Sequence, residues 1–157
     1  MSYLTFSKKY TGKKMLKSFC LFVLFINSAI AFSQLKPGSK VYLSYAETPN
    51  EVNVNAEDAK GMLKDYLIEK TSVQIVDNLE SSEFTIQLSL YEKNMGDRSA
   101  KLAIIDNTNS SVIYESKWVR GTMNAFYGYS GSRHAIGRLV KSELSEAYPS
   151  IEKKDGN

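Results

Sequence analysis

Cysteine and histidine are almost absent from this sequence. Only Cys20 and His134 occur in 157 residues. Cys20 lies inside an apolar run near the N-terminus, so the rest of the chain contains no cysteine and cannot be held by disulfides. With one histidine, the candidate metal ligands are carboxylates, and "DNTNSS" at 106–111 lacks the spaced acids and the glycine of a calcium loop. The sequence therefore predicts no metal site and no cofactor.

Acidic residues are absent from the first 33 positions, which contain five lysines. The eight-residue apolar run "FCLFVLFI" at 19–26 follows, then the small-residue pattern Ala29-Ile30-Ala31. The run is too short to span a bilayer, which requires about 20 apolar residues. A basic start, a short apolar run and an A-x-A pattern are typical of a secretory signal peptide. We expect cleavage near Ala31 or Ser33, with an uncleaved membrane anchor as the alternative.

The basic charge of the chain belongs mostly to this segment. The whole chain has 20 basic and 17 acidic residues, and without the five lysines 15 basic and 17 acidic residues remain, a net charge of about −2. This balance gives no argument for a nucleic-acid partner. Most of the apolar run follows Cys20, whereas a lipoprotein cysteine comes after such a run. We therefore expect a periplasmic or secreted protein with no stable membrane anchor after cleavage, and its oligomeric state stays open.

Hydrophobic periodicity predicts one domain over 34–149. An aromatic-rich run, strict alternation in "FTIQLSLY" and Asn/Ser turns indicate strands, whereas apolar residues at i, i+3, i+4 and i+7 indicate helices. The expected strands are 40–47, 73–77, 84–91, 99–106 and 111–120, and the expected helices are 56–70 and 132–148.

The order β-α-β-β-β-β-α predicts an α+β fold: a single mixed, largely antiparallel sheet of about five strands with two helices packed on one face. Strand 84–91 is expected to be antiparallel or edge-like, with one side wet. Pro149 should end the last helix, and 150–157 should form a flexible tail.

The two helices have recognisable starts and apolar stripes. Asn55 is a good N-cap for the first helix, and Ser130 or Ser132 for the second. Gly137 lies near the apolar stripe of the second helix and indicates either a close approach to the sheet or a neutral substitution. The expected stripe of that helix is Ile136, Leu139, Val140, Leu144 and Ala147.

Three stretches together resemble a family of small exported domains. "QIVD" at 74–77 precedes a strand that opens near an acidic residue, "EFTIQLSL" at 83–90, and "DNTNSSVIY" at 106–114 corresponds to a D-x-t-x-x-x-v-y/w strand turn, with its tyrosine one position later than in that pattern. This pattern resembles the TolB N-terminal domain, the curli-secretion lipoprotein and the lipoprotein activators of penicillin-binding proteins. The resemblance implies an envelope domain that binds partners and does not catalyse a reaction.

The stretch "GYSGSRH" at 128–134 is similar to a nucleophile elbow, but its second glycine is one position early. A catalytic triad needs a histidine that approaches the serine from elsewhere, with an acid behind it. His134, the only histidine, lies in the first turn of the helix that follows Ser130. We therefore favour a flexible turn with a serine N-cap, and keep anion binding at the helix start and serine hydrolysis as alternatives.

One segment is basic and aromatic in an otherwise acidic protein. Residues 116–142 contain five basic residues and no acid, whereas the rest of the expected mature chain has 10 basic and 17 acidic residues. Such a segment favours an anionic or sugar-rich partner. The alternative is that Trp118 is part of the core and that the charges are spread over a helix exterior. The candidate partner-binding residues are Arg120, Phe126, Tyr127, Tyr129 and Arg133.

The leading hypothesis is a non-enzymatic, exported binding or accessory protein of the bacterial cell envelope. Its partner would be an envelope protein or a glycan such as peptidoglycan. Two alternatives remain: a small secreted hydrolase that uses the Ser130 loop, and an assembly partner that pairs through an exposed sheet edge.

Export can be measured directly. When the full chain is expressed in a bacterium, we expect the envelope form to begin at Phe32 or Gln34, because a signal peptidase cuts after the small residues that follow the apolar run. N-terminal sequencing measures this. An envelope form that still begins at Met1, or at the alternative start Met15, would contradict the prediction.

Overall fold

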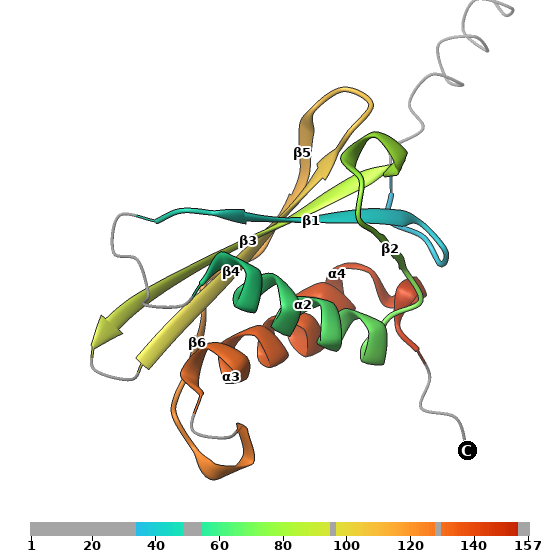
Figure 1. Ribbon diagram of the computed structural model, residues 1–157. Helices are drawn as coiled ribbons and strands as arrows, with labels where there is room; N and C mark the ends of the chain where they lie inside the picture. The colour runs from blue at the N-terminus through green and yellow to red at the C-terminus, as the bar shows by residue number, and fades with distance from the viewer. Residues whose placement is uncertain (1–33, 49–54, 95–96, 128–129, 154–157) are drawn as a thin grey trace, which may run out of the picture. The chain divides into compact units, whose positions relative to one another are not determined.

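The sheet contains six strands, and the expected α+β class is confirmed (Figure 1). The computed structural model describes residues 34–48, 55–94, 97–127 and 130–153. The strand order is β2-β1-β3-β4-β5, and β6 also pairs with β4. Strand β1 is parallel to β2 and β3, whereas the other pairs are antiparallel. The strands are β1 (Lys40–Ala46), β2 (Gln74–Val76), β3 (Phe84–Asn94), β4 (Asp97–Asp106), β5 (Ser111–Glu115) and β6 (Val119–Gly121).

The expected strand 111–120 is two strands, because the chain is interrupted at Ser116. The Ser116 backbone N–H donates to the Leu102 carbonyl at 2.9 Å, and its Oγ accepts from the Leu102 N–H at 3.0 Å. The serine hydroxyl thus replaces a backbone acceptor, and β6 resumes pairing with β4 further along. Strand β3 is central and not an edge, because β1 pairs with it on one side and β4 on the other.

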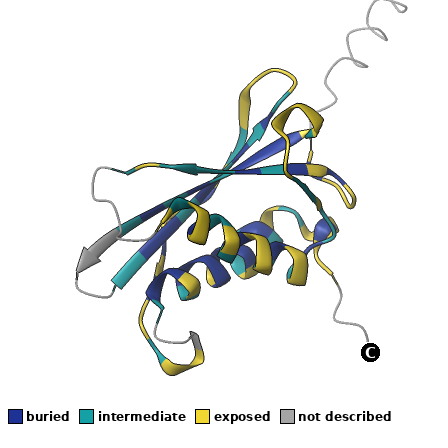
Figure 2. Ribbon diagram, viewed as in Figure 1, coloured by how far each residue is buried: buried dark blue, intermediate teal, exposed yellow. Residues whose placement is uncertain are grey.

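All the described α-helices lie on one face of the sheet (Figure 1). They are α2 (Ala56–Lys70), α3 (Gly131–Arg138) and α4 (Ser145–Ala147), and a π-helical segment, η3 (Leu139–Leu144), joins α3 to α4. None of the helices in the described ranges is long and apolar enough to cross a membrane. The core fills the space between this layer and the sheet (Figure 2), and its largest members include Leu63, Leu67, Ile86, Leu88, Leu102, Ile104, Ile136, Leu139 and Leu144.

The helix starts agree with the predicted caps. The Asn55 side chain accepts from the Glu57 N–H at 2.9 Å, and Ser130 Oγ accepts from the Arg133 N–H at 3.2 Å. The predicted apolar stripe of the last helix is confirmed except for Ala147, which is exposed. A π turn contains one residue more than an α turn, so the residues after η3 are rotated by about 100° from their α-helical positions.

Two glycines allow backbone to pack closely. A Cβ on Gly137 would lie 2.8 Å from Cζ of Tyr66, so the close approach is between α3 and α2, and not between helix and sheet as expected. A Cβ on Gly121 would lie 2.3 Å from both the Ala135 N and the Gly131 carbonyl oxygen. Strand β6 therefore packs against the backbone of α3 itself, at a position where only glycine fits.

The chain packs against the domain from Pro149 as far as Lys153, so the expected flexible tail is wrong for residues 150–153. Ile151 is fully buried, its carbonyl accepts from the Ser72 N–H at 2.8 Å, and Lys153 N–H donates to the Lys70 carbonyl at 2.9 Å. These bonds attach the C-terminal segment to the connection between α2 and β2. A single isoleucine between polar residues forms no periodic pattern, so the sequence alone does not reveal the burial of Ile151. Residues 154–157 lie outside the described ranges.

Strand β5 is attached to the end of the helical layer through a tyrosine pair. The rings of Tyr114 and Tyr148 are edge to face with centroids 5.6 Å apart, and Tyr114 donates to the Glu143 carbonyl at 3.1 Å. Burial raises the pKa of Tyr114, and the neighbouring Glu143 carboxylate adds to this effect. Burial also raises the pKa of Tyr148, so both hydroxyls stay protonated to a higher pH than that of an exposed tyrosine.

The close packing at Gly121 leads to a stability prediction with a matched control. We expect Gly121→Ala to lower the free energy of unfolding by about 1–3 kcal/mol, because the added methyl group overlaps α3 backbone that cannot move alone. Gly61→Ala, at an exposed helix position with no atom near its Cβ, should raise that free energy by about 1 kcal/mol. Urea denaturation of both variants measures this. Equal stability of Gly121→Ala and the parent chain would contradict the proposed packing.

Candidate functional site

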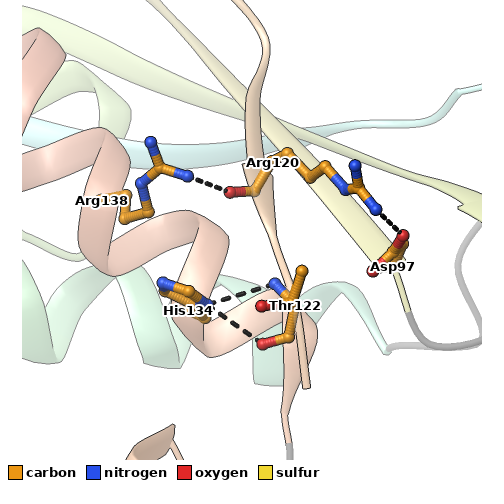
Figure 3. Close-up of polar contacts among 5 residues, drawn as sticks. All are labelled: Asp97, Arg120, Thr122, His134 and Arg138. Atoms are coloured by element: carbon orange, nitrogen blue, oxygen red, sulfur yellow. Dashed lines mark hydrogen bonds and ion pairs between the residues drawn. The ribbon is translucent and has the colours of Figure 1, made fainter. Parts of the chain in front are cut away.

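The predicted site surrounds strand β6 and the connector, which we define as residues 122–130 between β6 and α3. Strand β6 is attached to α3 by more than the packing at Gly121. Arg138, in the last turn of α3, donates from Nη1 to the Arg120 carbonyl at 2.8 Å (Figure 3). This bond satisfies a backbone carbonyl of β6. The strand thus lies between β4 and α3 and has partners on both sides.

His134 attaches the start of the connector to α3. Its Nδ1 lies 3.0 Å from the Thr122 carbonyl oxygen and 3.2 Å from the Thr122 N–H nitrogen (Figure 3). One nitrogen therefore faces both polar backbone groups of a single residue, as a donor or an acceptor according to the tautomer. The only histidine of the chain is thus a structural contact of the connector.

Arg120 has a partner on the sheet. Its guanidinium pairs with the Asp97 carboxylate of β4, and Figure 3 shows the side chain extending from β6 toward that strand. Ser99 is the direct cross-strand neighbour of Arg120, so Asp97 occupies the diagonal position two residues away. Because Arg120 pairs with Asp97, its charge is already partly neutralised within the protein.

Phe126 is the most exposed large apolar residue of the described ranges, at 96%. It lies in the short 3-10 turn η2 (Ala125–Tyr127), and Met123 in the same connector is 56% exposed. The side chain of Tyr127 and all of Tyr129 lie outside the described residues, so their predicted roles stay predictions. The described part of the connector therefore presents a phenyl ring to solvent.

Arg133 faces an acidic region of α2. It lines a shallow hollow of about 440 Å³ together with Glu57, Asp58 and Asp65, and Met62 contributes its apolar side chain. The excess of carboxylates makes this hollow unfavourable for an anion. The described candidate residues thus have three different environments: Arg120 is paired on β4, Arg133 lies beside α2, and Phe126 is free in solvent.

The Ser130 loop has the structure of a helix cap. The serine hydroxyl accepts the Arg133 N–H, and the His134 ring contacts Thr122 through Nδ1. Both side chains are therefore engaged in contacts that position backbone. Within the described ranges, no three His, Cys, Asp or Glu side chains gather closely enough to hold a metal ion.

The sequence did not decide whether Trp118 belongs to the core or to the surface. It is 44% exposed and lies between β5 and β6, whereas its neighbour Val119 is buried. Its ring meets Tyr91 of β3 edge to face with centroids 5.0 Å apart, and Lys101 Nζ lies 5.8 Å from its centroid. Trp118 is therefore on the sheet face opposite the helices, and is not in the core. The sequence could have indicated this placement, because consecutive side chains of a strand alternate between the two faces of a sheet.

No family model matches this chain, and no curated protein matches it. Solved structures do match. The PelC dodecamer from Paraburkholderia phytofirmans gives a TM-score of 0.52 at 16% identity, over 69% of this chain and 90% of that chain. The LpoB C-terminal domain from Salmonella enterica gives a TM-score of 0.45 at 10% identity, over 64% of this chain and 92% of that chain. At these identities the similarity concerns the fold alone.

Proposed function

We propose that this chain is an exported, non-catalytic binding protein of the bacterial cell envelope, which contacts a protein or glycan partner through the connector. The exposed phenyl ring of Phe126 is the observation that carries this proposal. Burying a phenylalanine side chain is worth about 1.5–3 kcal/mol. Aromatic residues that enter a partner's pocket are frequent centres of binding energy.

The connector is held at both ends, which suits a binding role. His134 and Gly121 fix its start against α3, and the Ser130 cap fixes its end. A ring presented from an anchored segment loses less conformational freedom on binding than one on a free loop. Arg120 and Arg133 flank the connector, but each lies near carboxylates, so we assign the main attraction to the ring and not to charge.

The described structure gives less support to pairing through a sheet edge than to contacts through the connector. Strand β5 has five residues and β6 has three, and the segment at Ser116 separates them. A short and interrupted edge is a poor template for an added strand. At the opposite edge, β2 has three residues.

Phe126→Ser tests the connector. We expect this variant to lose most capture of its partner from envelope extracts, or of peptidoglycan fragments, without a change in melting temperature, because the ring touches little of the protein. Ile68→Ser is the matched control, since Ile68 is an exposed apolar residue of α2, outside the connector. Equal capture by Phe126→Ser and the parent chain would contradict the proposal. Because the similar PelC structure is a dodecamer, size-exclusion chromatography of both variants separates self-association from partner capture.

Substitution of Ser130 separates capping from hydrolysis. Ser130→Ala should lower the free energy of unfolding by about 1 kcal/mol, and Ser130→Asp should restore it, because aspartate is also a good N-cap. Aspartate does not replace a serine nucleophile. We therefore expect Ser130→Asp to keep full partner binding. A cellular phenotype lost in Ser130→Asp, with a parental melting temperature, would favour the hydrolase instead.

A further inference from the structure

The sheet face opposite the helices carries one fixed and partly exposed indole. No described α-helix covers this face, since α2, α3 and α4 lie on the other side (Figure 1). Trp118 contacts Tyr91 of β3 and approaches Lys101 of β4, so it lies over two central strands. It remains 44% exposed in that position.

Neighbouring contacts determine the orientation of the indole. The Tyr91 ring is at 89° to it, the edge-to-face arrangement favoured for aromatic pairs. Lys101 Nζ is held 2.6 Å from the Glu115 carboxylate of β5, and this fixes the cation near the indole ring. An aromatic surface held in this way is prepared for a ligand before it arrives.

The groups of β3, β4 and β5 beside Trp118 are polar, and the two charged ones, Lys101 and Glu115, form an ion pair. Gln87 and Ser89 share the outward side of β3 with Tyr91, and both are half-buried. Lys101 and Glu115 cancel each other's charge. In the sheet register Ser89 is opposite Lys101, and Gln87 is opposite Ala103, which in turn pairs with Glu115. The hydrogen-bonding groups of this face are thus adjacent to the indole's neighbours, and the Lys101–Glu115 pair adds no net charge.

We infer that Trp118, Tyr91, Lys101 and Glu115, with Gln87 and Ser89, form a binding site for an uncharged oligosaccharide. A pyranose ring has an apolar face of C–H groups that stacks on an indole, and a rim of hydroxyls that bond to amide, hydroxyl and carboxylate groups. The cancelled charges favour a neutral glycan over an anionic one. A protein partner would require a larger apolar centre around the tryptophan than Gln87, Ser89 and Lys101 provide.

This site stands apart from the connector. Trp118 precedes β6 and contacts β3 and β4, whereas Phe126 follows β6 and is exposed on the connector. The two surfaces can therefore fail separately. A glycan that binds at Trp118 is consistent with the proposed function, but the inference does not depend on Phe126.

Tryptophan fluorescence tests the site directly, because Trp118 is the only tryptophan of the chain. Protein purified from cells that express the full-length chain is titrated with chitotetraose and cellotetraose, which are neutral, and with tetragalacturonate, which is anionic. We expect a saturable change in emission with at least one neutral sugar, half-complete at a concentration on the order of 1 mM, as suits a small open site. Tetragalacturonate should give a weaker response.

Substitutions distinguish sugar binding at Trp118 from sugar binding elsewhere on the protein. Tyr91→Ala and Lys101→Met keep the indole as reporter, and each should weaken binding severalfold, whereas Ile68→Ser, at an exposed position of α2 outside both surfaces, should leave the titration unchanged. Trp118→Ala should abolish binding to the sugar in calorimetry, and the two reporter variants test the site if it fails to fold. No emission change with either neutral sugar, tighter binding of tetragalacturonate, or full binding by Trp118→Ala would each overturn the inference.

Discussion

The packing of Gly121 against the backbone of α3 is the constraint on which both candidate surfaces depend. There is no space for a side chain between β6 and the helix at this position. The contact allows Arg138 to reach the Arg120 carbonyl and His134 to reach Thr122. Because β6 is held there, Val119 enters the core and its neighbour Trp118 is directed to the opposite sheet face. The connector then leaves from a backbone position that is fixed.

Local patterns in the sequence predicted most of the regular structure. The alternation from Phe84 to Leu90 and the Asn55 cap depend on residues within a few positions of each other, so one segment contains the whole signal. The strand break at Ser116 depends on Leu102, and the place of Gly137 depends on Tyr66. Such partners are distant in sequence, and periodicity contains no information about them. The burial of Ile151 was missed for the same reason.

The basic segment shows how tertiary structure changes an electrostatic prediction. Residues 116–142 contain no acid, yet carboxylates from other segments lie near their cations. Asp97 pairs with Arg120, and Asp58 and Asp65 line the hollow beside Arg133. Charge summed along a chain segment therefore overstates the potential of the surface that the segment forms. The exposed aromatic rings are a more specific indication of binding than the net charge.

Trp118 immediately precedes the three-residue strand β6, and Phe126 follows that strand within the connector. A strand this short has little stability of its own, and it is held because β4 pairs with one side and α3 packs on the other. Rigid support of this kind reduces the conformational entropy that a partner must overcome on binding. The single histidine and the Ser130 hydroxyl contribute to this support, because both contact backbone groups of the segment. His134, Ser130 and Arg138 thus bond to backbone groups of this segment, whereas the rings of Phe126 and Trp118 stay exposed.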